Sequence, residues 1–263
     1  MLLRIASALV LAPVTLAAVW AGGRWVLALV LLGAAVMGWE WAGLAARSRR
    51  FGALTGLIPM TVIAAPAALA LSGSAGIACL VAAAGALLVL VAARRKREPL
   101  WAAGGTLWIA LGTVAFLGLA VIPEKVHETV LWLLAIVWAN DIAAYGAGRG
   151  IGGPKLAPRL SPNKTWAGFV GGVAASGIVG GLVGWAAGAT SPAVLAGLSL
   201  VLGAVAQLGD LAESWAKRHF GVKDAGRLIP GHGGLLDRVD GLLAASVLAG
   251  AVTLAAGGSP LLW

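Results

Sequence analysis

Long apolar stretches separated by short polar ones make up most of this chain. A membrane-spanning helix needs about 20 predominantly apolar residues, because its backbone must satisfy its own hydrogen bonds in lipid. We therefore predict an all-α, polytopic integral membrane protein, with one membrane domain over residues 1–263 and no polar linker that divides it. The nine expected transmembrane helices are 3–22, 25–45, 53–72, 75–93, 100–122, 129–147, 166–189, 192–212 and 239–257.

The distribution of Lys and Arg along the chain predicts its orientation. Short cytoplasmic loops of membrane proteins collect these cations. A cytoplasmic N-terminus places 17 of the 19 Lys and Arg residues on the cytoplasmic side and leaves only Arg24 and Lys125 outside. Nine helices then place the C-terminus on the opposite side. The Arg-rich loops at 47–50 and 94–97 need no other explanation than this topology and anionic headgroups.

Composition supports the membrane class and excludes others. The chain is 60% hydrophobic, with a mean hydropathy of +0.95, whereas soluble domains have about 45–50% apolar residues. The net charge of +9 does not indicate nucleic-acid binding, because the cations lie in short loops between apolar stretches. The single cysteine, Cys79, excludes an internal disulfide, and we expect it to be a small buried apolar residue.

Two longer polar loops, at 148–165 and 213–238, differ from the others and are where we expect function. An aspartate at the centre of a bilayer costs about 2.5–3.5 kcal/mol, so Asp141, inside an apolar stretch, should face a partner or a water-filled cavity. The chain has ten acids, and six of them lie in or beside these loops: Asp141, Asp210, Glu213, Asp224, Asp237 and Asp240.

Helical spacing groups several of these side chains on common faces. Asp210, Glu213, Ser214 and Lys217 stand at positions 0, +3, +4 and +7, which share one face of a helix. Carboxylates from several helix ends suit a hard cation such as Mg²⁺, which keeps waters and also binds substrate phosphate. An interhelical salt bridge is the alternative for Asp210, Glu213 and Lys217. This geometry, together with the family resemblance given below, predicts that Asp141, Asp210, Asp237 and Asp240 either bind the metal or support the residues that do.

The cations of the same loops suit a polyanionic substrate, because ammonium and guanidinium groups donate hydrogen bonds to phosphate oxygens. Glycines allow close backbone approach. The residues thus indicate a phosphate and metal site at the cytoplasmic membrane surface, formed by Lys155, Lys164, Lys217, Arg218, Lys223, Arg238, Gly231, Gly233 and Gly234.

Other chemistry is less well supported. The chain lacks GxxxxGK[ST], HExxH and GxSxG motifs. Glu40, between Trp39 and Trp41, is expected to be an interfacial residue, with a buried hydrogen-bonding group as the alternative. His127 and His219 are expected to be solvated.

Residues 214–240, SWAKRHFGVKDAGRLIPGHGGLLDRVD, closely resemble the signature of the phosphatidate cytidylyltransferases: S-x-x-K-R, then K-D, then H-G-G-x-x-D-R-x-D. The upstream segment NDIAAYGAGRGIGGPKLAPRLSPNKTWAG resembles a second block of that family. The resemblance implies a bacterial inner-membrane enzyme, with a cytoplasmic active site, that condenses CTP with phosphatidate to CDP-diacylglycerol and pyrophosphate. It implies Mg²⁺, with Mn²⁺ as a substitute and K⁺ as a further candidate. A homodimer is a further candidate for its assembly.

The resemblance also assigns roles by position. Residues 1–128 are expected to be mainly structural and lipid-facing, and residues 129–263 to carry the catalytic helices and loops. A polyprenol kinase and a secondary transporter are the alternatives, but transporter sites lie near the bilayer midplane. The expected catalytic residues are Asp141, Asp210, Lys217, Arg218, Asp237, Arg238 and Asp240, and the expected substrate-binding residues are Lys155, Ser161, Lys164, Thr165, Glu213, Ser214, Lys223, Asp224, His232, Gly233 and Gly234.

Overall fold

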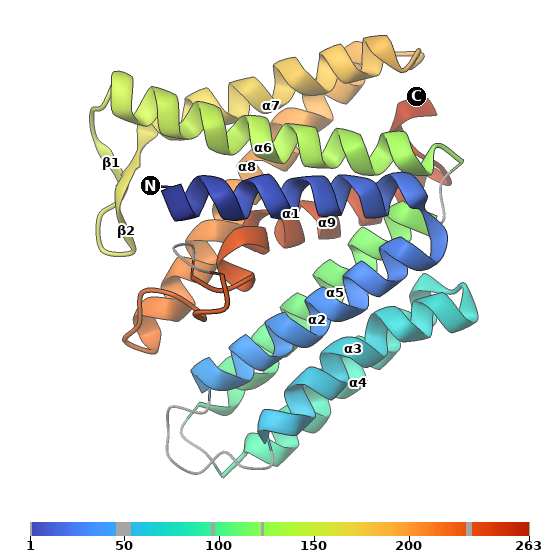
Figure 1. Cartoon of the computed structure of the whole chain (residues 1–263), viewed down its shortest axis with the longest axis vertical. Coiled ribbons are helices and arrows are strands. Elements are labelled where there is room, and N and C mark those ends of the chain that lie inside the picture. Colours follow the sequence, from blue (N-terminus) through green and yellow to red (C-terminus); the bar gives the residue numbers. More distant parts are fainter. Residues whose placement is uncertain (1, 46–53, 96–97, 122–123, 230–232, 263) are drawn as a thin grey trace. The chain divides into compact units, whose positions relative to one another are not determined.

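Helices make up nearly all of the regular structure of this protein (Figure 1). The computed structural model describes residues 2–45, 54–95, 98–121, 124–229 and 233–262. For residues 2–11 and 54 it describes the backbone but not the side chains. The chain forms two compact units. The first unit contains Met1–Gly118 and Ala216–Val239, and the second contains Leu119–Trp215 and Asp240–Trp263.

The first unit is built on five consecutive helices. These are α1 (Leu2–Ala21), α2 (Gly23–Ala45), α3 (Leu54–Ser72), α4 (Ala75–Ala93) and most of α5 (Pro99–Val121). Helices α2, α3 and α4 pack side by side in chain order (Figure 1). Gly38 permits the approach of α2 to α3, because a Cβ at this position would lie 2.8 Å from the Cα of Pro59. The Trp41 indole of α2 donates to the Ala102 carbonyl of α5 at 3.2 Å, which links these two helices.

The second unit contains four helices and a short hairpin. The elements are α6 (Val126–Gly150), β1 (Lys155–Ala157), β2 (Ser161–Thr165), α7 (Trp166–Ala186), most of α8 (Pro192–His219), most of α9 (Leu236–Ala256) and the 3₁₀ turn η1 (Pro260–Leu262). Helices α6 and α7 lie side by side (Figure 1). Between them, buried Asn140 accepts a hydrogen bond from Gln207 of α8 at 3.0 Å, and Gly172 leaves room for both side chains. Small residues and interhelical hydrogen bonds are typical of helix packing in membranes.

Most of the predicted helices are confirmed. Within the described residues, the eight helices α2 to α9 are long and apolar enough to cross a membrane. The part of α1 whose side chains are described, Ala12–Ala21, is apolar as well. The count of nine spans and the sides of the termini stay predictions. Cys79 is exposed, so its expected burial was wrong. In a membrane helix an apolar residue can face outward as readily as inward, because lipid is apolar too.

The hairpin was not expected from the sequence. Strands β1 and β2 pair antiparallel, with Lys155 opposite Thr165 and Ala157 opposite Ser161. The hairpin ends directly at α7, whose N-cap is Thr165: its hydroxyl accepts from the Gly168 amide at 3.1 Å. The polar loop at 148–165 is thus ordered by its own backbone pairing and by this cap.

Candidate active site

In the first unit, the loop that follows α8 carries most of the polar signature. The helix ends in a Schellman motif: Val222 N donates to Lys217 O at 2.8 Å and Gly221 N donates to Arg218 O at 3.0 Å. Gly221 has a φ of 68°, which a glycine adopts without steric cost. Further along, Ile229 and Gly233 exchange two backbone hydrogen bonds, so the loop folds back before α9 begins at Leu236.

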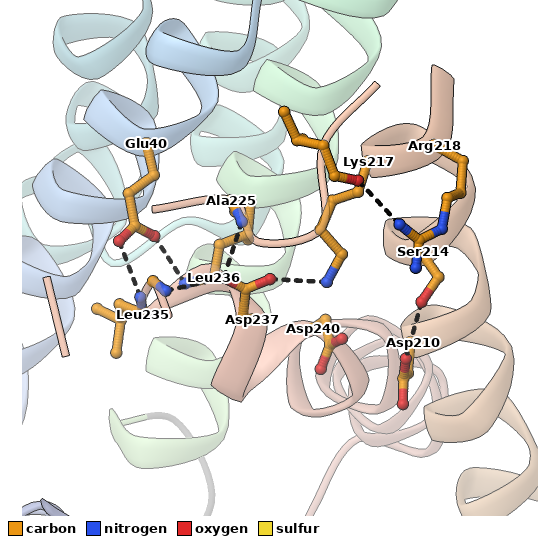
Figure 2. A network of polar contacts seen from close by, with 12 residues as sticks. Glu40, Asp210, Ser214, Lys217, Arg218, Ala225, Leu235, Leu236, Asp237 and Asp240 are labelled. Atoms are coloured by element: carbon orange, nitrogen blue, oxygen red, sulfur yellow. Dashed lines mark hydrogen bonds and ion pairs between the residues drawn. The ribbon is translucent and has the colours of Figure 1, made fainter. Parts of the chain in front are cut away.

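Asp237, in the first turn of α9, ties this loop together (Figure 2). Its Oδ1 accepts from Lys217 Nζ at 2.6 Å, and its Oδ2 accepts from the amides of Ala225 and Gly234, both at 2.8 Å. The side chains of Lys217 and Asp237 are only 12% and 2% exposed. Poorly solvated charges interact strongly, so this carboxylate fixes the end of α8 and two points of the loop at once.

Glycine is required at position 233 for two reasons. Its φ is 89°, and a Cβ there would lie 2.9 Å from Asp237 Oδ2 and 3.3 Å from the Cβ of Asp224. Of the predicted site residues, the structure therefore brings Lys217, Asp224, Gly233 and Asp237 together. His232 lies outside the described residues.

Three other predicted site cations of this unit are exposed. Arg218, Lys223 and Arg238 all have accessible side chains, and Arg218 Nη1 donates to the Val222 carbonyl at 3.1 Å. These exposed guanidinium and ammonium groups can bind a polyanion without breaking the hydrogen bonds that Asp237 makes within the loop.

In the second unit, a separate polar cluster involves the hairpin and α8. Lys164 of β2 pairs with Asp210 of α8, with Nζ and Oδ2 2.7 Å apart, and Ser214 Oγ lies 3.4 Å from Asp210 Oδ1. The Lys164 and Asp210 side chains are 22% and 41% exposed, so solvent reaches this pair. Asp210 thus pairs with Lys164 of the hairpin, and Lys217 of the same helix pairs with Asp237.

Other predicted substrate-binding residues of this unit have varied surroundings. Lys155 is exposed at the start of β1, and Ser161 is half-buried at the start of β2. Thr165 is 4% exposed and caps α7, so its hydroxyl serves the helix terminus. A threonine at this position is thus explained by its role as the N-cap of α7.

The acids of the second unit do not form a closed metal cage. Asp141 is exposed on α6, Asp240 is half-buried on α9, and Glu213 is fully buried on α8. Among the residues that the structure describes, no three His, Cys, Asp or Glu side chains are grouped closely enough to hold a metal ion. Their oxygen donors still fit Mg²⁺, which is usually bound by one or two carboxylates together with waters and substrate phosphates.

Glu40 was expected to lie at the membrane interface, and that expectation was wrong. Glu40 of α2 is 3% exposed, and its carboxylate accepts from the Leu235 amide at 2.9 Å and the Leu236 amide at 2.8 Å (Figure 2). It is therefore the buried hydrogen-bonding group of the alternative. The sequence signal was an acid within an apolar helix, but its partners lie about 195 residues away.

His219 lies exposed at the end of α8, as the sequence predicted. Its ring stacks on Trp101, with centroids 4.5 Å apart, and its Nε2 lies 3.0 Å from Glu98 Oε2. These contacts connect the end of α8 to the start of α5. His219 is therefore part of the packing that holds the C-terminal turn of α8 within the first unit.

Comparison with known proteins gives consistent matches. A sequence model described as "Cytidylyltransferase family" matches residues 2–255. The chain is 43% identical over 247 residues to the phosphatidate cytidylyltransferases of Brucella suis and Brucella melitensis, which covers 93% of this chain and 90% of each relative. It is also 43% identical over 140 residues to the phosphatidate cytidylyltransferase of Staphylococcus aureus strain COL, covering 51% of this chain and 54% of that protein.

Proposed function

Because this chain belongs to the cytidylyltransferase family, we propose that it transfers the cytidylyl group of CTP to phosphatidate, which yields CDP-diacylglycerol and pyrophosphate. The observation that carries this proposal is the anchoring of the signature loop by Asp237. One carboxylate binds Lys217 and the amides of Ala225 and Gly234, so it holds these three positions together, and exposed cations lie beside them in the sequence. Such a surface suits substrates that carry several phosphates.

The reaction needs no protein nucleophile. A phosphate oxygen of phosphatidate is already anionic near neutral pH, because the second pKa of a phosphate monoester is about 6. This oxygen forms a new bond to the α-phosphorus of CTP, and the bond from that phosphorus to the β-phosphate oxygen breaks. Pyrophosphate leaves with the electron pair. The protein then contributes positioning and charge stabilisation, as is usual for transfers at phosphorus.

The cations have the clearest roles in this proposal. Arg218, Lys223 and Arg238 of the first unit are exposed and can donate to phosphate oxygens. In the second unit, Lys155 is exposed on the hairpin and Lys164 lies partly accessible beside Asp210. We assign these residues to binding the triphosphate of CTP and the phosphate of the lipid. Lys217 differs, because its ammonium group is held by Asp237 and supports the loop as well as the local positive charge.

We propose Mg²⁺ as the metal, and assign it to carboxylates of the second unit. Asp141, Asp210 and Asp240 supply hard oxygen donors, and the Asp210 side chain is 41% exposed. The Asp237 side chain is only 2% exposed, and its oxygens accept hydrogen bonds from Lys217, Ala225 and Gly234. When bound, Mg²⁺ would neutralise the charge on the phosphate oxygens. Mn²⁺ accepts the same oxygen ligands and should substitute for it.

We further propose that the reaction takes place at the cytoplasmic face of a bacterial inner membrane. The sorting of 17 of 19 Lys and Arg residues to one side supports this orientation. The signature loops belong to that cation-rich side.

A direct assay tests the proposed function. The protein purified in detergent is incubated with CTP, phosphatidate and Mg²⁺, and both pyrophosphate and the CDP-lipid are measured. We expect equimolar formation of the two products that depends on both substrates. Arg238→Ala should reduce turnover severely without loss of membrane insertion, while Arg24→Ala, on the expected opposite side, should have little effect. Pyrophosphate formation without a CDP-lipid, or equal activity of both variants, would contradict the proposal.

A further inference from the structure

The carboxylate of Glu40 caps the start of α9. It accepts hydrogen bonds from Leu235 N at 2.9 Å and Leu236 N at 2.8 Å, which are the residue before the helix and its first residue. The first four amides of a helix lack partners within it, and the helix dipole favours a negative charge at this end. A side chain of α2 thus takes the capping role that a local Ser, Asp or Asn usually plays, and residues 233–235 contain none of these.

Two glycines of the loop close around the same carboxylate. A Cβ at Gly226 or at Gly234 would lie 2.5 Å from Glu40 Oε1. Only a backbone without side chains can approach so closely. The carboxylate is therefore enclosed by the loop backbone on two sides and by the start of α9, and it determines where residues 226 and 234–236 lie within the first unit.

These same residues determine the position of Asp237. Asp237 directly follows Leu236, and Gly234, whose backbone packs against Glu40, donates its own amide to Asp237 Oδ2 at 2.8 Å. Figure 2 shows Glu40 on one side of the Leu235–Asp237 segment and Lys217 bound to Asp237 on the other. A displacement of the segment at Glu40 would therefore move the carboxylate that holds Lys217.

We propose that Glu40 is a positioning residue for the cytidylyl transfer, an inference that rests on the proposed function. It touches no substrate and acts through Asp237. By holding the first turn of α9, it keeps the pair of Lys217 and Asp237 in the geometry that the signature loop needs. Misplacement of catalytic groups by about 1 Å can reduce a rate by about 100-fold, so the effect should appear in kcat and not in the affinity for CTP.

The test compares three variants of the full-length protein in detergent. Glu40→Gln keeps the shape but replaces one accepting oxygen by an NH₂ group that faces a backbone donor, and it should lower kcat by about 10- to 100-fold, with the KM for CTP changed less than threefold. Glu40→Asp keeps the charge on an arm shorter by one methylene and should recover part of this loss. Thr61→Val is the matched control, because this buried hydroxyl of the same unit donates only to carbonyls of its own helix, Leu57 and Ile58, among the bonds shown, and its loss should leave kcat within twofold of the wild type.

Hydrogen exchange supplies a second measurement that does not depend on turnover. Peptides containing Leu235 and Leu236 should exchange at least tenfold faster in Glu40→Gln than in the wild type, and Thr61→Val should leave them unchanged. If the wild type makes no CDP-lipid, the proposed function fails, while the exchange result still decides whether Glu40 positions this segment. A normal kcat per folded Glu40→Gln molecule, a change confined to KM, or unchanged exchange in that variant would overturn the positioning role.

Discussion

The pair of Lys217 and Asp237 offers the sharpest test of how the loop is held. We consider Lys217→Met, Asp237→Asn and the double variant. The paired side chains are 12% and 2% exposed, so each single change leaves a poorly solvated partner without its counter-charge. Breaking a buried pair from one side costs about 3–5 kcal/mol. At about 2–4 °C per kcal/mol for a chain of this size, the lower bound corresponds to a decrease in Tm of about 6–12 °C.

The double variant separates the pair from its surroundings. It removes both charges together, so the destabilisation should be smaller than the sum of the single effects, by a coupling free energy of about 1–3 kcal/mol. All three variants should lose nearly all turnover, because a neutral side chain at 237 cannot hold Lys217 and a Met at 217 supplies no positive charge. The stability readout and the activity readout are thus expected to diverge in the double variant.

The measurement is thermal unfolding in detergent, followed by the fluorescence of the 12 tryptophans and checked by size-exclusion chromatography. Lys223→Met is the matched control, since Lys223 is exposed in the same loop and its substitution should change stability by no more than about 0.5 kcal/mol. Additive effects of the two single substitutions, or a single variant that unfolds at the wild-type temperature, would refute the view that this pair holds the loop.

Three further predictions concern the second unit, the metal and the topology. The side chains of Lys164 and Asp210 are 22% and 41% exposed, so their ion pair should contribute only about 0–1 kcal/mol to the free energy of unfolding. Lys164→Met should therefore leave the thermal midpoint nearly unchanged but lower kcat/KM for CTP at least tenfold. An unchanged kcat/KM would show that Lys164 is not part of the site. Excess chelator should stop the reaction and Mg²⁺ should restore it, with Mn²⁺ partly effective, whereas full activity in chelator would reject the metal. Reporter fusions after residues 50, 97, 160 and 225 should give cytoplasmic signals, and a fusion at the C-terminus should report the opposite side. A cytoplasmic C-terminus would mean that the number of spans is even.

The helices were largely predictable from the sequence because lipid imposes a strong constraint. An apolar stretch of about 20 residues in a bilayer has little choice but to form a helix. The helix ends were less predictable: α8 continues to His219, well beyond the predicted end at 212, and α9 begins at Leu236, before the predicted start at 239. In both cases the additional residues include charged side chains, and an apolar criterion stops where the charges begin.

The members of the candidate site were easier to predict than their partners. Helical spacing placed Asp210 and Lys217 on one face of α8, and the helix is continuous through both positions. Spacing could not show that Asp210 pairs with Lys164 of the hairpin and that Lys217 pairs with Asp237 of α9. Such partners depend on loop closure, which no periodic pattern encodes. The same limit explains Glu40, whose bonds to Leu235 and Leu236 depend on tertiary packing alone.

The contacts of Glu40 and Asp237 explain why so apolar a chain concentrates glycines in its signature loop. A buried carboxylate must have its oxygens hydrogen-bonded, since an unpaired buried charge is costly. Together these two acids accept hydrogen bonds from four backbone amides, at 225, 234, 235 and 236. The backbone around these carboxylates is so close that a Cβ at Gly226, Gly233 or Gly234 would meet a carboxylate oxygen at 2.5–2.9 Å. The glycines therefore serve the acids that shape the loop, and a substitution of one should weaken the loop through the carboxylate it displaces.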